Sequence, residues 1–153
     1  MEKLSPQDKK LLRILQENSK FDITDLTQRL NMSRTSVYER IKRLESEGYI
    51  KKYAAIIDEK KVGLNFTVIV NVQLESQQFE VTEEFARQVR ELGEVMQAYV
   101  ISGVYDIVLK VVVKDPEEFN NFVVKKLSVI PQISKIQSSF VMSYIKQSTE
   151  LPF

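Results

Sequence analysis

Two short stretches of the sequence hold the residues whose types and spacing could do chemistry. The first is "SGVYD", residues 102–106, where a glycine and an aspartate interrupt two apolar runs. The second is "SRTSVYERIKR", residues 33–43, in which hydroxyl, acidic and basic side chains are interleaved with apolar ones. The first stretch offers a single carboxylate. The second offers several hydrogen-bonding groups that could recognise another molecule.

Catalysis by either stretch is disfavoured by the composition. The chain has no His and no Cys, which removes the usual general base at neutral pH and the commonest metal ligands. Its four glycines are scattered, so there is no glycine-rich phosphate loop. Asp106 is followed four residues later by Lys110, and we expect a charge pair between them rather than a catalytic pair. The sequence therefore predicts no catalytic residue, no metal site and no cofactor, and the protein is not expected to be an enzyme.

The charge is distributed unevenly along the chain. Residues 1–53 carry 12 Lys and Arg against 8 Asp and Glu, a net charge of +4. Residues 54–153 carry 10 against 13, a net charge of −3. A basic first third indicates a polyanionic partner for that part of the chain. No apolar run approaches 18 residues and the first residues lack a secretory pattern, so we expect a cytoplasmic protein without a membrane span.

The first part of the chain is typical of three helices and a small hairpin. Ser5, Asp22 and Ser33 each precede a segment with helical apolar spacing and are placed to cap it. The run "YIKKYAAIID", residues 49–58, alternates loosely and predicts one or two short strands. This order is the outline of a winged helix-turn-helix domain, which we assign to residues 1–57.

The second part changes its apolar period from about 3.6 to 2 after the charged residues 58–65, which we interpret as a linker. The strand at 66–74 places its even-numbered apolar residues on one face. The full order of elements in residues 66–153 is β-α-β-β-α-β, which predicts a ferredoxin-like domain with an antiparallel sheet and both helices on one face. The fold class is therefore α+β, a winged helix-turn-helix followed by a ferredoxin-like domain.

Residues 104–113 are apolar on both alternations. A sheet face that is left uncovered by helices would then be a large apolar patch, which monomers avoid. We therefore expect a homodimer that packs through its sheets.

The third helix predicts a surface for double-stranded DNA. A helical wheel places Val37, Ile41 and Leu44 toward the core and the polar residues outward. Its outer residues suit base edges or phosphates, as do two lysines in the expected wing. The expected base contacts are Arg34, Thr35, Tyr38, Glu39 and Lys42, and the expected phosphate contacts are Ser33, Ser36, Arg43, Lys51 and Lys52.

Several stretches resemble one known family over residues 3–146. The stretches "LSPQDKKLLRILQ", "DLTQRLNMSRTSVYERIKRLESEGYI" and "GVYD" are similar to the Lrp/AsnC, or feast/famine, transcription regulators. The resemblance implies a dimer that often assembles into octamers, promoter DNA as the partner, and an amino acid or similar metabolite as effector. It places the effector at Ser102, Gly103, Val104, Tyr105 and Asp106.

Within that turn, backbone groups near Gly103 are natural partners for the carboxylate or ammonium of an amino acid. Asp106 is a candidate for the ammonium, with its pairing to Lys110 as the alternative. A ferredoxin-like RNA reader is disfavoured because the central strands carry Val and Ile rather than stacking aromatics. A regulator or architectural protein of the same fold that binds DNA without any effector remains open.

Overall fold

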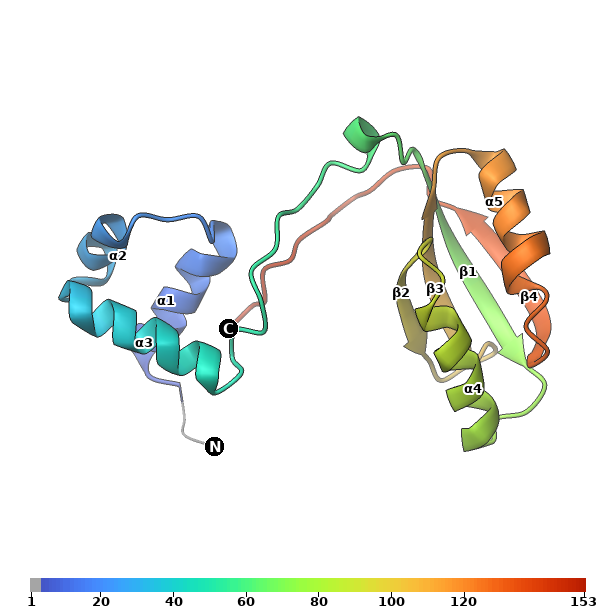
Figure 1. Cartoon of the computed structure of the whole chain (residues 1–153), viewed down its shortest axis with the longest axis horizontal. Coiled ribbons are helices and arrows are strands. Elements are labelled where there is room, and N and C mark those ends of the chain that lie inside the picture. The colour runs from blue at the N-terminus through green and yellow to red at the C-terminus, as the bar shows by residue number, and fades with distance from the viewer. Residues whose placement is uncertain (1–3) are drawn as a thin grey trace. The chain divides into compact units, whose positions relative to one another are not determined.

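The computed structural model describes residues 4–153, which divide into two compact units. Unit 1 comprises the chain up to Ile56 together with Lys146–Phe153, and unit 2 comprises Ile57–Ile145. The expected boundary differs at one end, because residues 146–153 group with the helices of unit 1 and not with the sheet. Figure 1 shows the helices of unit 1 and the sheet of unit 2.

The described part of unit 1 contains three helices, and each begins directly after its predicted cap. They are α1 (Pro6–Glu17), α2 (Ile23–Leu30) and α3 (Arg34–Ser46). The side chains of Ser5, Asp22 and Ser33 accept hydrogen bonds from main-chain N–H groups in the first turns of these helices. Such bonds satisfy donors that have no partner within the helix, which is why these residue types start the helices.

The core of unit 1 lies between the three helices. Val37 and Leu44 of α3 are fully buried, as are Leu11 of α1 and Leu26 of α2. Ile41 completes the buried side of α3, which confirms the predicted orientation of that helix. The opposite side of α3 is consequently left outside the core.

The predicted wing strands are not present. Residues 51–58 are extended and exposed, and within the described residues 4–153 they pair with no strand. A strand exists only where its N–H and C=O groups bond to a neighbour, and this segment finds no such neighbour among the residues that the structure describes. The inference of a hairpin from the alternation of side chains was therefore wrong.

A buried carboxylate joins α1 to α3. Asp8 is 2 % exposed, and its Oδ1 lies 2.5 Å from Nη1 of Arg40 and 2.8 Å from Nη2 of Arg43. Its Oδ2 accepts hydrogen bonds from the main-chain N–H and the hydroxyl of Ser5, at 2.9 and 2.6 Å. Both carboxylate oxygens are therefore saturated, which is the condition under which a buried charge is tolerated.

Opposing effects act on the pKa of Asp8. Burial alone would raise it, because a desolvated carboxylate prefers to be neutral. The hydrogen bonds from Ser5 and the guanidinium groups of Arg40 and Arg43 outweigh that effect and hold the pKa well below its usual range. Asp8 is therefore charged in the folded state across the physiological range.

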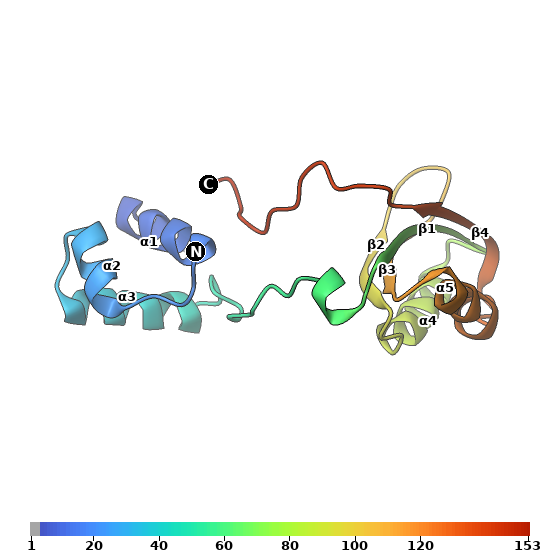
Figure 2. The same cartoon turned by 90° about the horizontal axis from the view of Figure 1, so that it is seen from above.

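Unit 2 is a four-stranded antiparallel sheet with the strand order β2-β3-β1-β4. Its strands are β1 (Phe66–Leu74), β2 (Val95–Val100), β3 (Ile107–Val113) and β4 (Ile133–Phe140). Its helices are α4 (Phe79–Arg90) and α5 (Pro116–Phe122), with a short 3-10 helix η1 (Lys60–Val62) and a π-helical segment η2 (Val123–Leu127) that follows α5 directly. Figure 2 shows α4 and α5 on the same face of the sheet. The predicted ferredoxin-like arrangement is confirmed.

The core of unit 2 lies between that face and the two helices. Val70 of β1 and Leu109 of β3 are paired in register and fully buried. Phe85 of α4 and Phe122 of α5 pack against them, each 1 % exposed. The even-numbered residues of β1 face this core, as the apolar alternation predicted.

The other face of the sheet is less apolar than expected. In register across the strands, one row of this face is Gln97, Lys110, Ile69 and Ser139. The next row is Tyr99, Val108, Asn71 and Gln137. Polar residues from β1, β2 and β4 interrupt the apolar residues of β3, so the expectation of a continuous apolar face is wrong. A dimer that packs through the sheets would need polar complementarity as well as apolar contact.

We predict that Asp8→Asn weakens unit 1 and removes part of its acid sensitivity. Loss of the charge leaves Arg40 without its carboxylate and Arg43 with Glu47 alone, at a cost of about 3 kcal/mol in the free energy of unfolding at pH 7. Because the folded pKa of Asp8 lies below the unfolded value of about 3.9, its contribution is complete above that value. The contribution is then lost as the pH falls toward the lower folded pKa. Urea unfolding at pH 7 and pH 3 measures both effects.

Asp25→Asn is the matched control, since Asp25 is exposed on α2. The control should change the free energy of unfolding little at either pH. If the free energy of unfolding falls by the same amount between pH 7 and pH 3 in Asp8→Asn and in the wild type, then Asp8 does not contribute to the pH dependence of stability.

Candidate nucleic-acid interface and effector turn

The second and third helices form a helix-turn-helix. Asn31 has a left-handed backbone conformation with φ of 52°, which ends α2 and reverses the chain direction. Two residues later, Ser33 caps α3 through a 3.2 Å bond from the main-chain N–H of Ser36. In this layout the second helix is the one that enters the major groove of DNA.

The outward face of α3 presents the predicted base contacts. Thr35, Glu39 and Lys42 are exposed on the side opposite the core. Tyr38 is 55 % exposed, and the ammonium of Lys42 lies 4.8 Å from the centroid of its ring. This cation–π contact favours one arrangement of two long side chains at the surface. The face offers a hydroxyl, a carboxylate, an ammonium and an aromatic ring within three turns.

Some of the predicted phosphate contacts are exposed to solvent, and others already bond to groups within unit 1. Lys51 and Lys52 are exposed in the segment after α3. The hydroxyl of Ser33 donates to that of Ser36 at 3.0 Å, so these two groups form a small polar site at the helix start. A phosphate at that position could accept from the same hydroxyls and from main-chain N–H groups.

Arg43 is already engaged within unit 1. Besides Asp8, its guanidinium contacts Glu47 at 3.3 Å, four residues further along the helix. Its contacts therefore favour a structural role in joining α3 to α1 over the expected role at phosphate. Arg40, which sequence reasoning did not single out, makes the shorter contact to Asp8. The signal that was missed is the pairing of one acid near the start of α1 with two arginines spaced by three on α3.

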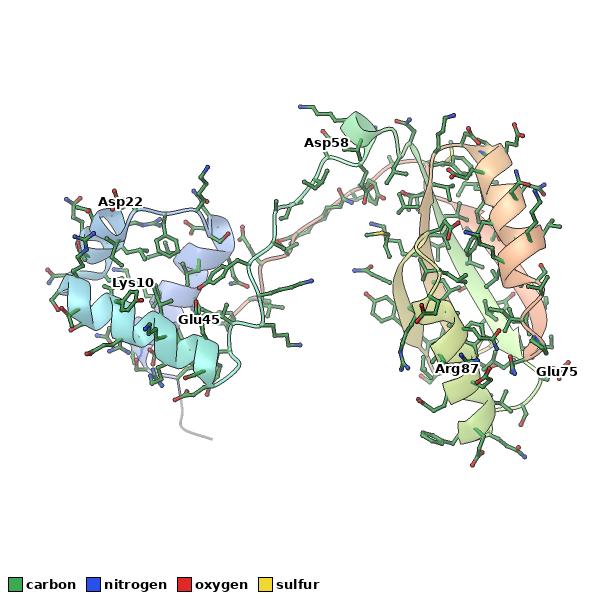
Figure 3. All side chains as sticks on the ribbon, in the orientation of Figure 1. Lys10, Asp22, Glu45, Asp58, Glu75 and Arg87 are labelled. Atoms are coloured by element: carbon green, nitrogen blue, oxygen red, sulfur yellow. The ribbon has the colours of Figure 1, made fainter. Side chains whose placement is uncertain are left out.

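An open cleft of about 660 Å³ borders the same helix. Its wall combines aromatic and aliphatic side chains with Arg34, Thr35 and Glu45. The apolar lining residues are Phe21, Ile23, Tyr38, Ile41 and Tyr53. Three expected base contacts therefore lie on its rim, and Glu45 is labelled near the end of α3 in Figure 3.

Tyr53 is fixed to α3 at this cleft. Its hydroxyl donates to Oε1 of Glu45 at 2.9 Å. Burial, and then the hydrogen bond and charge of Glu45, raise the pKa of Tyr53 to about 12. Tyr53 is therefore a neutral hydrogen-bond donor at physiological pH, and it ties the start of the extended segment to the recognition helix.

The expected effector turn joins β2 to β3. Gly103 has a φ of +145°, a conformation that side chains other than glycine rarely adopt, and no atom lies within 4 Å of where a Cβ would stand. Ser102 is exposed, and Val104 is 81 % exposed. The hydroxyl of Tyr105 hydrogen-bonds the side chain of Gln137 on β4. The turn thus presents main-chain groups on the surface of unit 2.

Asp106 is held by the end of β1 rather than by Lys110. Its Oδ2 accepts from the main-chain N–H of Leu74 at 2.8 Å, and its Oδ1 accepts from the side-chain amide of Gln77 at 2.8 Å. Lys110 instead lies 3.3 Å from Oε1 of Glu59. The expected pair was wrong because four residues of extended chain span about 13 Å, too far for a salt bridge.

A groove of about 400 Å³ runs between α4 and β2 and ends beside this turn. Val100 and Ile107, the residues on either side of the turn, both line it. Phe85 and Val89 of α4 form part of its apolar wall. The turn therefore combines exposed main-chain polar groups with an adjacent groove whose lining is partly apolar and partly polar, the polar part including Glu83 and Arg90.

Neither a metal site nor a membrane-spanning helix is found in the described chain. Within residues 4–153, no group of three or more acidic, His or Cys side chains is placed to hold a metal ion. None of the helices described there has the length and apolarity that a membrane span requires.

Two family models match the chain. Residues 4–51 match a winged helix-turn-helix DNA-binding domain, and residues 67–151 match the Lrp/AsnC ligand-binding domain. Among curated proteins, the transcriptional regulator AzlB of Bacillus subtilis is 33 % identical over 97 % of this chain and 95 % of its own length. The DNA-binding transcriptional activator DecR of Escherichia coli is 32 % identical over 95 % of each chain.

Solved structures agree with these matches along the whole chain. The transcriptional regulator NMB0573 of Neisseria meningitidis, solved as a complex with L-Met, is 31 % identical with a TM-score of 0.93, covering 98 % of this chain and 97 % of its own. An AsnC family transcriptional regulator of Agrobacterium tumefaciens is 36 % identical with a TM-score of 0.92, covering 97 % of each chain. The chain therefore belongs to the Lrp/AsnC family of DNA-binding transcription regulators.

Proposed function

We propose that this regulator reads DNA with the outer face of α3 and binds an amino acid at the turn between β2 and β3. The observation that carries the first part is the exposed polar surface of a helix whose other side is fully buried. The proposed base contacts remain Arg34, Thr35, Tyr38, Glu39 and Lys42. The proposed phosphate contacts are Ser33, Ser36, Lys51 and Lys52, because Arg43 is engaged by Asp8 and Glu47.

The family assembles as dimers and octamers, and we propose the same for this chain. A dimer would place two copies of α3 in successive major grooves, about 34–36 Å apart. Its site would then be a pair of half-sites related by the two-fold axis of the protein. We place this activity in the cytoplasm, the compartment that holds the DNA in bacteria such as those of the two curated relatives.

The proposed effector is an amino acid with an apolar side chain. NMB0573, which shares the fold and 31 % of the sequence, was solved with L-Met. Here the exposed main chain near Gly103 suits a carboxylate or ammonium group, and the part of the neighbouring groove that Phe85 and Val89 line suits an apolar side chain. Asp106 already accepts two hydrogen bonds, so an ammonium would use its remaining lone pairs. The alternative is a regulator of the same fold that needs no effector.

We predict that Arg34→Ala and Lys52→Ala weaken DNA binding in different ways. Arg34→Ala should cost about 1–3 kcal/mol on a preferred duplex and relax the sequence preference, because a base contact is lost. Lys52→Ala should weaken binding evenly across duplexes and reduce the slope of log K against log salt by about 1. Fluorescence anisotropy from about 50 to 200 mM salt, with a duplex selected from genomic fragments and a scrambled duplex, measures both.

The matched control is Arg87→Ala, which removes the same charge from the exposed side of α4 in unit 2 (Figure 3). It should leave both the affinity and the salt slope close to the wild type. Wild-type binding by Arg34→Ala and Lys52→Ala at physiological salt would refute the assignment of α3 and the segment after it as the DNA surface.

We predict that an apolar amino acid raises the melting midpoint of the wild type. A ligand that binds only the folded state at 100 times its Kd adds about 2.7 kcal/mol to the free energy of unfolding. The experiment is a thermal melt across a panel that includes L-methionine and L-leucine. Gly103→Ala should lose the shift, because its side chain forces the backbone of the turn away from its left-handed geometry.

The control is the DNA affinity of Gly103→Ala without amino acid, which should equal that of the wild type because every proposed DNA contact lies in unit 1 and Gly103 lies on neither connection between the units. If no amino acid shifts the midpoint of the wild type while DNA binding is intact, the alternative without an effector is supported.

A further inference from the structure

The last residues of the chain lie on the first helix. Gln16 of α1 makes two hydrogen bonds with the main chain of Leu151, accepting from its N–H at 2.7 Å and donating to its carbonyl at 3.4 Å. One turn earlier on α1, Nε of Arg13 donates to the main-chain oxygen of Phe153 at 2.5 Å. These contacts join residues separated by 135 and 140 positions in the sequence.

Phe153 adds an apolar contact to these polar ones. Its side chain is partly buried and packs against the core of unit 1, the cluster that contains Leu11 and Leu26. The neighbouring apolar residue Leu151 is 68 % exposed, so it contributes its main chain and not its side chain. Phe153 is therefore the side chain that anchors the segment.

We propose that Leu151–Phe153 form a C-terminal clasp that holds α1 in place and thereby supports the DNA-reading helix. Asp8 of α1 forms ion pairs with Arg40 and Arg43 of α3. A contact that stabilises the position of α1 therefore also stabilises the position of α3, whose outer face is proposed to bind DNA. The partner of this surface on α1 is a segment of the same chain.

The clasp also gives unit 1 a second connection to the sheet. The chain leaves unit 1 after α3, forms unit 2, and returns to unit 1 after β4. A change that displaces the end of β4 would be transmitted to α1 through residues 141–150. DNA binding would then depend on unit 2 by a path that is separate from the extended segment after α3.

Phe153→Ala tests the clasp, with Leu151→Ala as the matched control. Without the Phe153 ring, the amide hydrogens of α1 should exchange about tenfold faster, because part of an apolar core contact is lost. Leu151→Ala removes an exposed side chain and should leave exchange in α1 unchanged. Hydrogen exchange followed by mass spectrometry on the full chain reads both. Equal exchange in Phe153→Ala and the wild type would overturn the proposal.

The claim that the clasp supports DNA binding rests on the proposed function, and a measurement of DNA affinity tests the two separately. Phe153→Ala should bind the selected duplex several-fold more weakly than the wild type, and Leu151→Ala should bind normally. A wild type that binds no duplex would contradict the proposed function, and the exchange experiment would still decide the clasp. A Phe153→Ala variant with faster exchange and unchanged affinity would overturn the link to DNA binding.

A crosslink decides whether the clasp closes within one chain. Because the chain has no cysteine, the double variant Gln16→Cys with Leu151→Cys carries only the engineered pair. A short bis-maleimide should join them within one chain, giving a product of monomer mass. A product of dimer mass, or no crosslink at all, would overturn a clasp that closes in cis.

Discussion

The DNA-binding unit depends on one buried carboxylate. Asp8 is removed from water, and it is stable there because Ser5, Arg40 and Arg43 satisfy both of its oxygens. A pair of this kind adds little net stability compared with apolar packing, since desolvation offsets much of the attraction. Its value is geometric, because the fork of each arginine accepts only a narrow range of positions for α1 relative to α3.

That geometry explains what the sequence could and could not predict in unit 1. The caps at Ser5, Asp22 and Ser33 and the buried side of α3 follow from local rules, because each cap contacts residues two or three positions away. The ion pair of Arg43 does not follow from local rules, because its partner Asp8 is 35 positions away in the sequence. From the sequence alone, an arginine at this position suits a phosphate equally well. The prediction of wing strands was wrong for a related reason. A strand requires a neighbouring strand, and the alternation of side chains within one segment cannot identify that neighbour.

In the sheet, too, features set within one strand were predicted and features set by contacts between strands were not. The order of helices and strands along the chain and the core face of β1 were predicted because apolar periodicity is a property of each element by itself. The character of the opposite face is a property of rows that cross four strands. In one such row Val108 lies beside Asn71 and Tyr99, so a pattern read from β3 alone overstated how apolar that face is. Asp106 likewise found its partners at the end of β1, which is adjacent in the sheet but distant in sequence.

The ion pairs at Asp8 also determine how unit 1 can bind a polyanion. Two of the four basic residues of α3, Arg40 and Arg43, are used internally, which leaves Arg34 and Lys42 on the exposed face. With Lys51 and Lys52, the proposed DNA surface offers only a few cations, while the carboxylates of Glu39 and Glu45 oppose them on the same helix. Each neutralised phosphate contributes about 0.9 to the salt slope, so a single unit gains little affinity from the backbone. On the proposed assignment, strong binding requires more than one copy of α3 on the same duplex, and the proposed dimer would supply the second copy.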